Sequence, residues 1–231
     1  ILIGLVGSEM CIRDSNNIVN MSLLNGMDMI ALTDHNSCKN CWAAVRAGEE
    51  AGVTVVPGME LTTSEEAHVV CLFPTVEQAE AFGDYVESRS PEIRNRPEIF
   101  GDQLIMDWQD EVVGRVSRLL INASSISVGE LPGLMAEFGG AAFPAHIDHD
   151  SYSVISSLGA IPAEAEFHAA EISGKGDKEL LLKRYPELQD MILLLDSDAH
   201  YLDWLKERRP WLDLPEKTAR CLVDALNGKI Q

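Results

Sequence analysis

Residues 29–36 read MIALTDHN, an apolar run that ends in a cluster of polar side chains. The apolar part predicts a short buried strand, and Thr33 to Asn36 then stand at its C-terminal end. The same pattern recurs along the chain, in which an apolar strand ends in a carboxylate or an imidazole. In α/β proteins, ligand sites assemble at that end, because the loops that follow parallel strands converge there. The stretch therefore predicts an α/β fold with mainly parallel strands and a site at one edge.

Three more predicted strands end in this way. Residues 53–56 run towards Glu60, residues 141–143 run towards His146, and residues 191–195 run towards Asp198 and His200. His68 begins a further strand at 68–73, and Glu171 lies inside a strand at 169–172, where an outer role at the site and a plain strand role are both open. Asp198 and His200 point the same way if their segment is extended, because side chains alternate along a strand.

Helical segments separate these strands, and Gly26, Gly52 and the pair at 139–140 follow as natural stops. The expected helices cover 17–25, 41–51, 76–88, 127–138 and 215–227. Residues of about 91–125 break this alternation of strands and helices and contain a predicted hairpin at 103–106 and 111–113, with a further apolar run at 119–121. We interpret 91–125 as an insertion over one end of the core, within a single domain at 16–231.

The bulk composition limits the range of possible functions. The chain has 231 residues, with 18 Lys and Arg against 37 Asp and Glu, which gives a net charge of −19. This charge repels phosphate backbones, so we expect no nucleic-acid coating, although bound cations could still admit a phosphorylated substrate. Five scattered cysteines favour a reducing, cytoplasmic compartment, and no apolar run is long enough to span a membrane.

Imidazole and carboxylate groups together suit zinc, manganese or iron, and a carboxylate can bridge two ions. Each residue also has a simpler interpretation, because a lone histidine at a strand end is often a surface residue and Asp34 could cap the helix that follows. The ordered set of strand ends is what favours a metal site. His149 and His168 lack such a setting and are expected to be solvated or structural.

At these residues the sequence resembles the PHP (polymerase and histidinol phosphatase) family. The resemblance rests on TDHN at 33–36, PGMELTT at 57–63 with HVV at 68–70, PAHID at 144–148 and SDAH at 197–200, and covers nearly all of the chain from Asn16. It implies a distorted (β/α)7 barrel and two or three divalent ions, Mn, Zn or Fe. It also implies that Asp34 orients a neighbour, and that the metal ligands are His35, Glu60, His68, His146, Asp198 and His200.

One part of the family pattern is absent. PHP proteins usually open with a strand that ends in His-x-His, whereas the first histidine here is His35. Residues 5–15 resemble a translated sequencing adaptor instead. We therefore expect residues 1–15 to be a foreign leader outside the fold, and the chain to lack its first barrel strand and some metal ligands.

The leading functional hypothesis is hydrolysis of a small phosphate ester or phosphodiester by a metal-activated water, with impaired activity in this chain. His35, Glu60 and Asp198 are expected to carry the catalysis. Lys39 and Lys175, and with them Arg94 and Arg96, are candidates for holding the substrate phosphate. Cys38 and Cys41 form a CxxC pair, for which we favour packing and capping over a zinc or redox role. The alternative function is a non-catalytic regulatory or proofreading-like metal-binding module.

Overall fold

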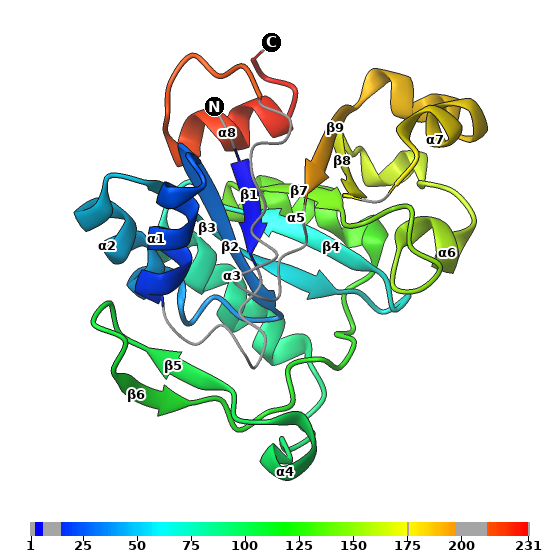
Figure 1. The fold of residues 1–231 in the computed structure, drawn as a ribbon. Helices are drawn as coiled ribbons and strands as arrows, with labels where there is room; N and C mark the ends of the chain where they lie inside the picture. Colours follow the sequence, from blue (N-terminus) through cyan, green and yellow to red (C-terminus); the bar gives the residue numbers. More distant parts are fainter. Residues whose placement is uncertain (1–2, 7–14, 175, 197–211, 231) are drawn as a thin grey trace.

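The computed structural model describes residues 3–6, 15–174, 176–196 and 212–230. These residues form an α/β fold of three sheets with helices packed around them (Figure 1). The largest sheet has the order β1-β2-β3-β4-β7. Its strands are β1 (Ile3–Val6), β2 (Met29–His35), β3 (Thr54–Thr62), β4 (His68–Leu72) and β7 (Ala141–Pro144).

The main sheet is not mainly parallel, which corrects the prediction from the sequence. β1, β2 and β3 pair in parallel, but β4 runs antiparallel to both β3 and β7. Only residues 63–67 connect β3 to β4, and a parallel connection needs a crossover of a dozen or more residues. The short loop therefore reverses β4 and makes a hairpin with β3.

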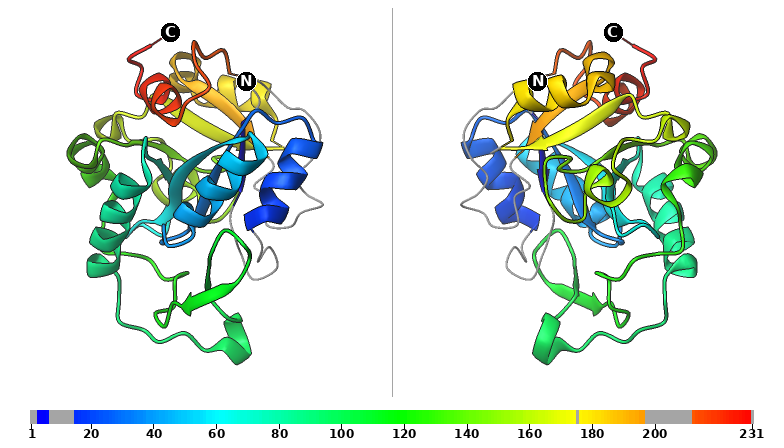
Figure 2. Two further views of the ribbon diagram at one scale, coloured as in Figure 1. Left: turned by 90° about the vertical axis from the view of Figure 1, so that its left-hand side faces the viewer. Right: turned by 90° about the vertical axis from the view of Figure 1, so that its right-hand side faces the viewer.

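Two smaller sheets complete the described strands. β8 (Ala169–Ser173) pairs in parallel with β9 (Ile192–Asp196). The predicted hairpin is confirmed, with β5 (Leu104–Met106) antiparallel to β6 (Val112–Arg115), whereas residues 119–121 form no strand. The hairpin extends from the end of the main sheet to which β2 runs, as the side views also show (Figure 2).

The described strands do not close into the barrel that the resemblance implies. β7 and β8 are neighbours without a shared ladder, and the Ile147 N–H donates to the Glu171 carbonyl 2.9 Å away just beyond β7. Pro144, the last residue of β7, has no N–H to donate, which limits a ladder at this point.

Residues 3–6 differ from the expectation for the leader. β1 pairs along its whole length with residues 29–32 of β2, so this part of the 1–15 segment joins the sheet.

The predicted helices are present with small shifts at their ends. Gly52 ends α2 in the left-handed conformation with φ 78°, which glycine adopts without a steric cost. None of the described helices is long and apolar enough to cross a membrane. The α-helices are α1 (Ser15–Leu24), α2 (Cys41–Ala51), α3 (Val76–Arg89), α4 (Pro97–Phe100), α5 (Leu131–Phe138), α6 (Val154–Leu158), α7 (Lys178–Arg184) and α8 (Ala219–Leu226). Three short 3₁₀ helices are η1 (Val128–Glu130), η2 (Ala163–Ala165) and η3 (Pro186–Asp190).

Gly58 allows β3 and β4 to approach closely. A Cβ atom at this position would lie 2.5 Å from the Cys71 carbonyl oxygen and 2.6 Å from Leu72 Cδ2. We expect Gly58→Ala to lower the free energy of unfolding by about 1–3 kcal/mol, the usual cost of overpacking. Urea denaturation measures this change. Gly129→Ala is the control, because its Cβ would meet no atom within 4 Å, and equal effects of the two substitutions would contradict the prediction.

Candidate metal centre

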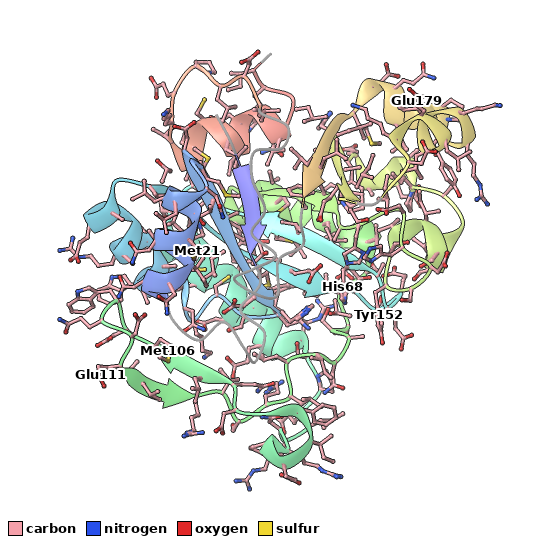
Figure 3. All side chains as sticks on the ribbon, in the orientation of Figure 1. Met21, His68, Met106, Glu111, Tyr152 and Glu179 are labelled. Atoms are coloured by element: carbon pink, nitrogen blue, oxygen red, sulfur yellow. The ribbon has the colours of Figure 1, made fainter. Side chains whose placement is uncertain are left out.

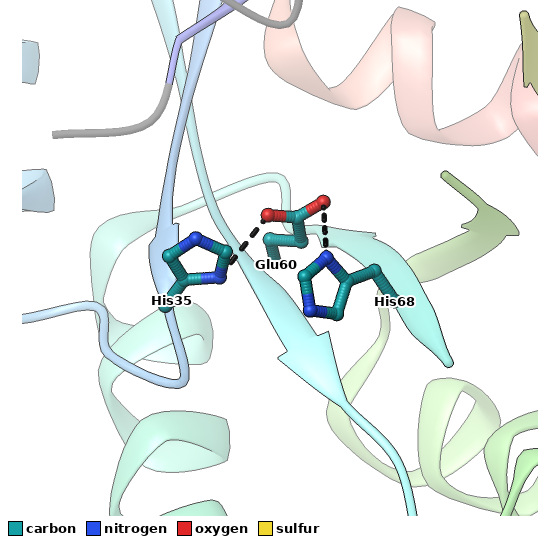
Figure 4. Close-up of side chains that lie close together, drawn as sticks. All are labelled: His35, Glu60 and His68. Atoms are coloured by element: carbon teal, nitrogen blue, oxygen red, sulfur yellow. Dashed lines mark ion pairs between the residues drawn. The ribbon is translucent and has the colours of Figure 1, made fainter. Parts of the chain in front are cut away.

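Three histidines surround the carboxylate of Glu60 at one edge of the main sheet. His35 Nδ1 lies 3.2 Å from Glu60 Oε2, while His68 Nδ1 and His146 Nε2 each lie 3.3 Å from Oε1. Figure 4 shows the rings of His35 and His68 on either side of the carboxylate, one towards each oxygen. His68 Nδ1 and His146 Nε2 are themselves 3.2 Å apart. The structure therefore brings together four of the six predicted metal ligands.

The sheet topology explains this meeting. His35 and Glu60 are direct partners in the parallel pair of β2 and β3. Because β4 is reversed, its first residue, His68, lies opposite Thr62 at the end of β3. β7 runs back along β4, so Pro144 ends opposite Val69 and the chain reaches His146 shortly afterwards. The ends of β2, β3 and β7 thus share an edge with the start of β4.

Opposing effects set the charge of Glu60, which is 6% exposed. Burial raises the pKa of its carboxyl group, but hydrogen bonds from His146 and His68 and the charge of His35 lower it by more. The pKa of Glu60 consequently lies well below its usual value, and the carboxylate stays ionised at neutral pH. A buried anion held among imidazoles is the electrostatic setting that a cation requires.

The residues present fit a divalent metal ion. His35, Glu60 and His68 each offer a ligand atom, and these atoms lie within 4.8 Å of one another. Ligands about 2.0–2.1 Å from a tetrahedral ion are separated by roughly 3.3–3.4 Å. The contacts of 3.2–3.3 Å around Glu60 are close to that spacing. The mixed nitrogen and oxygen set suits zinc, manganese or iron.

Two further rings cover this cluster from a single loop. Tyr152 stacks on His68 with ring centroids 5.0 Å apart, and His149 stacks on His146 at 4.6 Å (Figure 3 shows Tyr152 beside His68). His146 and Tyr152 have φ values of 29° and 55°, a region that non-glycine residues rarely adopt. Strained backbone of this kind is concentrated at functional sites. His149 was expected to be solvated or structural; it is exposed, and its stacking on His146 places it at the edge of the site.

Two asparagines fasten the site to the predicted insertion. Asn36 Nδ2 donates to the carbonyls of Leu120 and Asn122 at 2.6 and 3.0 Å, and Asn36 Oδ1 accepts the Thr62 N–H at 2.8 Å. In the sequence, only the position of Asn36 directly after His35 points to this role.

Asn40 makes the second connection. Its Nδ2 donates to Asp34 Oδ2 and to the Leu104 carbonyl at 3.0 and 3.2 Å, and its Oδ1 accepts the Met106 N–H. Asp34 is thereby held by Asn40, the residue before α2, which is itself bound to the hairpin.

The remaining predicted residues have other positions. Asp198, His200 and Lys175 lie outside the described residues. Lys39 pairs with Glu87 of α3 at 3.0 Å and is not among the groups around Glu60. Glu171 is buried in β8. Of the other candidates for the phosphate, Arg94 forms a backbone bridge to Arg118, and Arg96 pairs with Glu98 at 3.4 Å.

Cys38 and Cys41 are packed in the core. Each Sγ donates to the Gly58 carbonyl oxygen at 3.3 Å, and their side chains are 2% and 0% exposed. Burial, a contact with Cys41 and the nearby charge of Asp34 raise the pKa of the Cys38 thiol well above its ordinary value, and burial raises that of Cys71. The thiols of Cys38 and Cys71 are therefore protonated and shielded in the folded chain.

We expect Cys38 and Cys71 to resist alkylation by iodoacetamide at pH 8 until the chain is unfolded in urea, since only an exposed thiolate reacts. Their raised folded-state pKa values also stabilise the fold below pH 9.0, the ordinary thiol pKa. That contribution is lost as the pH rises above this value, because the unfolded thiols then release protons first. Peptide mass spectrometry measures the labelling of each cysteine, and rapid labelling of the folded chain would contradict the expectation.

No protein-family model matches the chain, and no curated protein matches it at a significant level. Solved structures do. Two structures of endonuclease Q, one from Pyrococcus furiosus and one bound to a 27-mer duplex with an abasic lesion, give TM-scores of 0.61 and 0.63 at 13% identity. They match 96% and 98% of this chain, which spans about half of their length, 55% and 56%.

Two further structures match over most of both chains. A protein from Bifidobacterium adolescentis described as a metal-dependent phosphoesterase gives a TM-score of 0.57 at 16% identity, over 86% of this chain and 87% of its own. An amidohydrolase from Chromobacterium violaceum with bound sulfate gives 0.61 at 15% identity, over 100% and 98%. At such identities the likeness shows the fold alone. The chain shares its α/β fold with structures described as hydrolases.

Proposed function

We propose that this chain carries the site of a PHP-type metal-dependent phosphoesterase that hydrolyses a small phosphate ester or phosphodiester. The observation that carries the proposal is the ionised, buried Glu60 carboxylate with three imidazoles at 3.2–3.3 Å. His35, Glu60, His68 and His146 would hold the metal, together with Asp198 and His200 from the sequence motif. Structural neighbours described as a phosphoesterase and an endonuclease support hydrolysis of phosphate esters.

Each residue around Glu60 has a distinct task in this proposal. A bound divalent ion supplies Lewis acidity, which lowers the pKa of water and offsets charge on phosphoryl oxygens. Glu60 would provide the negative charge that retains the cation, and its second carboxylate oxygen would be available to a second ion. Asp34 and Asn40 would orient the end of β2 that carries His35, since such outer groups fix the direction of metal ligands. The residue 91–125 segment, fastened by Asn36 and Asn40, is the proposed selector of the substrate.

We propose a small substrate in preference to a DNA duplex. One endonuclease Q structure binds a duplex with an abasic lesion, so the fold accommodates that chemistry in a relative. The net charge of −19 on this chain opposes binding of a long polyanion. A single phosphate group would need only the metal ions at the site to offset its charge.

The test combines metal analysis with a substrate panel. The purified chain is loaded with Mn²⁺ or Zn²⁺, its metal content is measured by mass spectrometry, and hydrolysis is assayed on p-nitrophenyl phosphate, its bis-ester, short alkyl phosphates and an abasic duplex. We expect turnover of a small ester that His146→Ala removes and His168→Ala retains, since His168 is not among the histidines that contact Glu60 and instead lines a separate pocket. Cleavage of the duplex alone would overturn the small-substrate proposal. Bound metal without any turnover would favour the non-catalytic module.

A further inference from the structure

A buried hydroxyl group without a hydrogen-bond partner lies at the end of β3. Thr62 is 2% exposed, and its Oγ1 atom has no hydrogen-bond partner among the residues that the structure describes. Most buried side-chain polar atoms in proteins are paired, because an unpaired atom loses its contacts with water and gains none in return. Such an exception is typical of a hydroxyl whose partner is a water molecule, an ion or a reactant.

Two neighbouring buried hydroxyl groups are paired. The Thr63 hydroxyl oxygen accepts the Ala67 N–H at 3.3 Å. The Ser124 hydroxyl donates to the Thr62 carbonyl oxygen at 2.9 Å, and its oxygen accepts the Ile126 N–H at 3.2 Å. The fold therefore uses the hydroxyl groups around Thr62 in its own hydrogen bonds, and the Thr62 hydroxyl differs from both of them.

The pleat of the sheet turns the Thr62 side chain towards the candidate metal centre. Thr62 and Glu60 are two positions apart on β3, and side chains at such positions lie on the same face of a strand. Thr62 is also the antiparallel partner of His68, and directly opposite side chains share a face, with Cβ atoms about 4.5–5.5 Å apart. On that face His68 Nδ1 lies 3.3 Å from Glu60 Oε1. The unpaired hydroxyl therefore lies beside groups that would hold the metal.

Three contacts fix the backbone that carries this hydroxyl. The Thr62 N–H donates to Asn36 Oδ1 at 2.8 Å. The Thr62 carbonyl oxygen accepts both the N–H and the hydroxyl of Ser124, at 2.9 Å each. Because threonine is branched at Cβ, its χ1 angle has few favourable values. The hydroxyl is therefore restricted to few positions, as a group that orients a reactant has to be.

We propose that Thr62 is a positioning residue whose hydroxyl orients the water molecule that attacks phosphorus. This inference rests on the proposed hydrolysis and adds a residue to it. A water molecule is small enough for so enclosed a position, and a hydroxyl group can both donate to it and accept from it. Orientation lowers the barrier, because the water loses its rotational freedom before the reaction begins.

The Thr62 hydroxyl keeps its own proton throughout the reaction. The water oxygen forms the new bond to phosphorus, and the bond from phosphorus to the alcohol oxygen breaks, with its electron pair on that oxygen. Of the two protons of the water, one ends on the departing alcohol and the other on the phosphate product. Thr62 therefore contributes orientation alone.

Thr62→Val tests the proposal, because valine has nearly the shape of threonine and lacks the hydroxyl. In the metal-loaded chain, we expect kcat for p-nitrophenyl phosphate to fall at least about tenfold, with KM and metal content as in the wild type. In urea denaturation, the metal-free variant should be at least as stable as the wild type, because no hydrogen bond within the protein is lost. Thr62→Ser keeps the hydroxyl and should recover most of kcat.

Thr63→Val is the matched control. It also removes a buried hydroxyl, but one that accepts the Ala67 N–H, so it should lower the stability and leave kcat unchanged. Wild-type kcat in Thr62→Val would overturn the proposal, and so would a loss of stability or of metal content that accompanies the loss of kcat. A higher KM at unchanged kcat would place the hydroxyl on the ester and refute its assignment to the water.

These measurements also separate the two proposals. A wild-type chain that binds metal and hydrolyses no ester would overturn the proposed function, and the role of Thr62 with it. An active wild type together with an equally active Thr62→Val would overturn the role of Thr62 alone.

Discussion

Glu60→Gln is expected to reduce metal-dependent hydrolysis by at least about 100-fold and to lower the bound metal content, because loss even of outer groups at metal sites costs 10- to 100-fold. The substitution preserves the shape of the side chain and removes only its charge. In the native chain that charge lies at 3.2–3.3 Å from His35, His68 and His146. An amide would present a donor to nitrogen atoms that must themselves face a cation.

The measurement compares kcat/KM and metal content of Glu60→Gln with those of the wild type and of Glu98→Gln. Glu98 is an exposed residue of α4, so its variant controls for the loss of one charge. Circular dichroism confirms that both variants fold. Wild-type metal content together with wild-type kcat/KM in Glu60→Gln would remove Glu60 from the site.

Asn36→Ala is expected to lower the free energy of unfolding by about 3 kcal/mol and to reduce activity as well. The substitution leaves the carbonyls of Leu120 and Asn122 and the N–H of Thr62 without their side-chain partner. Each buried polar group without a partner costs about 1–3 kcal/mol. Alanine also has to adopt the native φ of 49°, which favours asparagine or glycine.

Two companion variants separate these causes. Asn36→Gly removes the side chain without the backbone strain and should recover about 1 kcal/mol relative to alanine. Asn36→Asp keeps an acceptor for Thr62 but cannot donate to the two carbonyls, so it should remain destabilised. Urea denaturation gives the free energies. Wild-type stability in Asn36→Asp would show that the contacts with the 91–125 segment contribute nothing.

The sequence predicted the local elements well, and for a physical reason. Apolar runs such as 29–32 and helix stops such as Gly52 act over a few residues, and the structure confirms the elements that they indicate. It also confirms that His35, Glu60, His68 and His146 come together. Their signal was strong because each polar residue lies close to the end of an apolar strand or begins one.

Strand direction and long-range contacts were harder to predict from the sequence. The reversal of β4 depends on the short length of the 63–67 loop. The pattern of apolar strands alone does not indicate the direction of a strand. The attachments made by Asn36 and Asn40 join residues distant in sequence, and an asparagine gives no local sign of its partners. The predicted phosphate contact of Lys39 overlooked Glu87, which faces it from α3. The roles of Asp198, His200 and Lys175 stay predictions.

The β3–β4 hairpin also bears on the order of events during folding. Glu60 and His68 belong to its two strands, so they meet as soon as the hairpin closes, before β2 or β7 has to dock. Isolated hairpins close in about 1–10 μs, and short loops cost the least entropy. A cation can therefore engage a nascent pair of ligands on a partly folded chain. Refolding in the presence of Mn²⁺ or Zn²⁺ should be faster than in chelator, with the metal acting as a template for its own site.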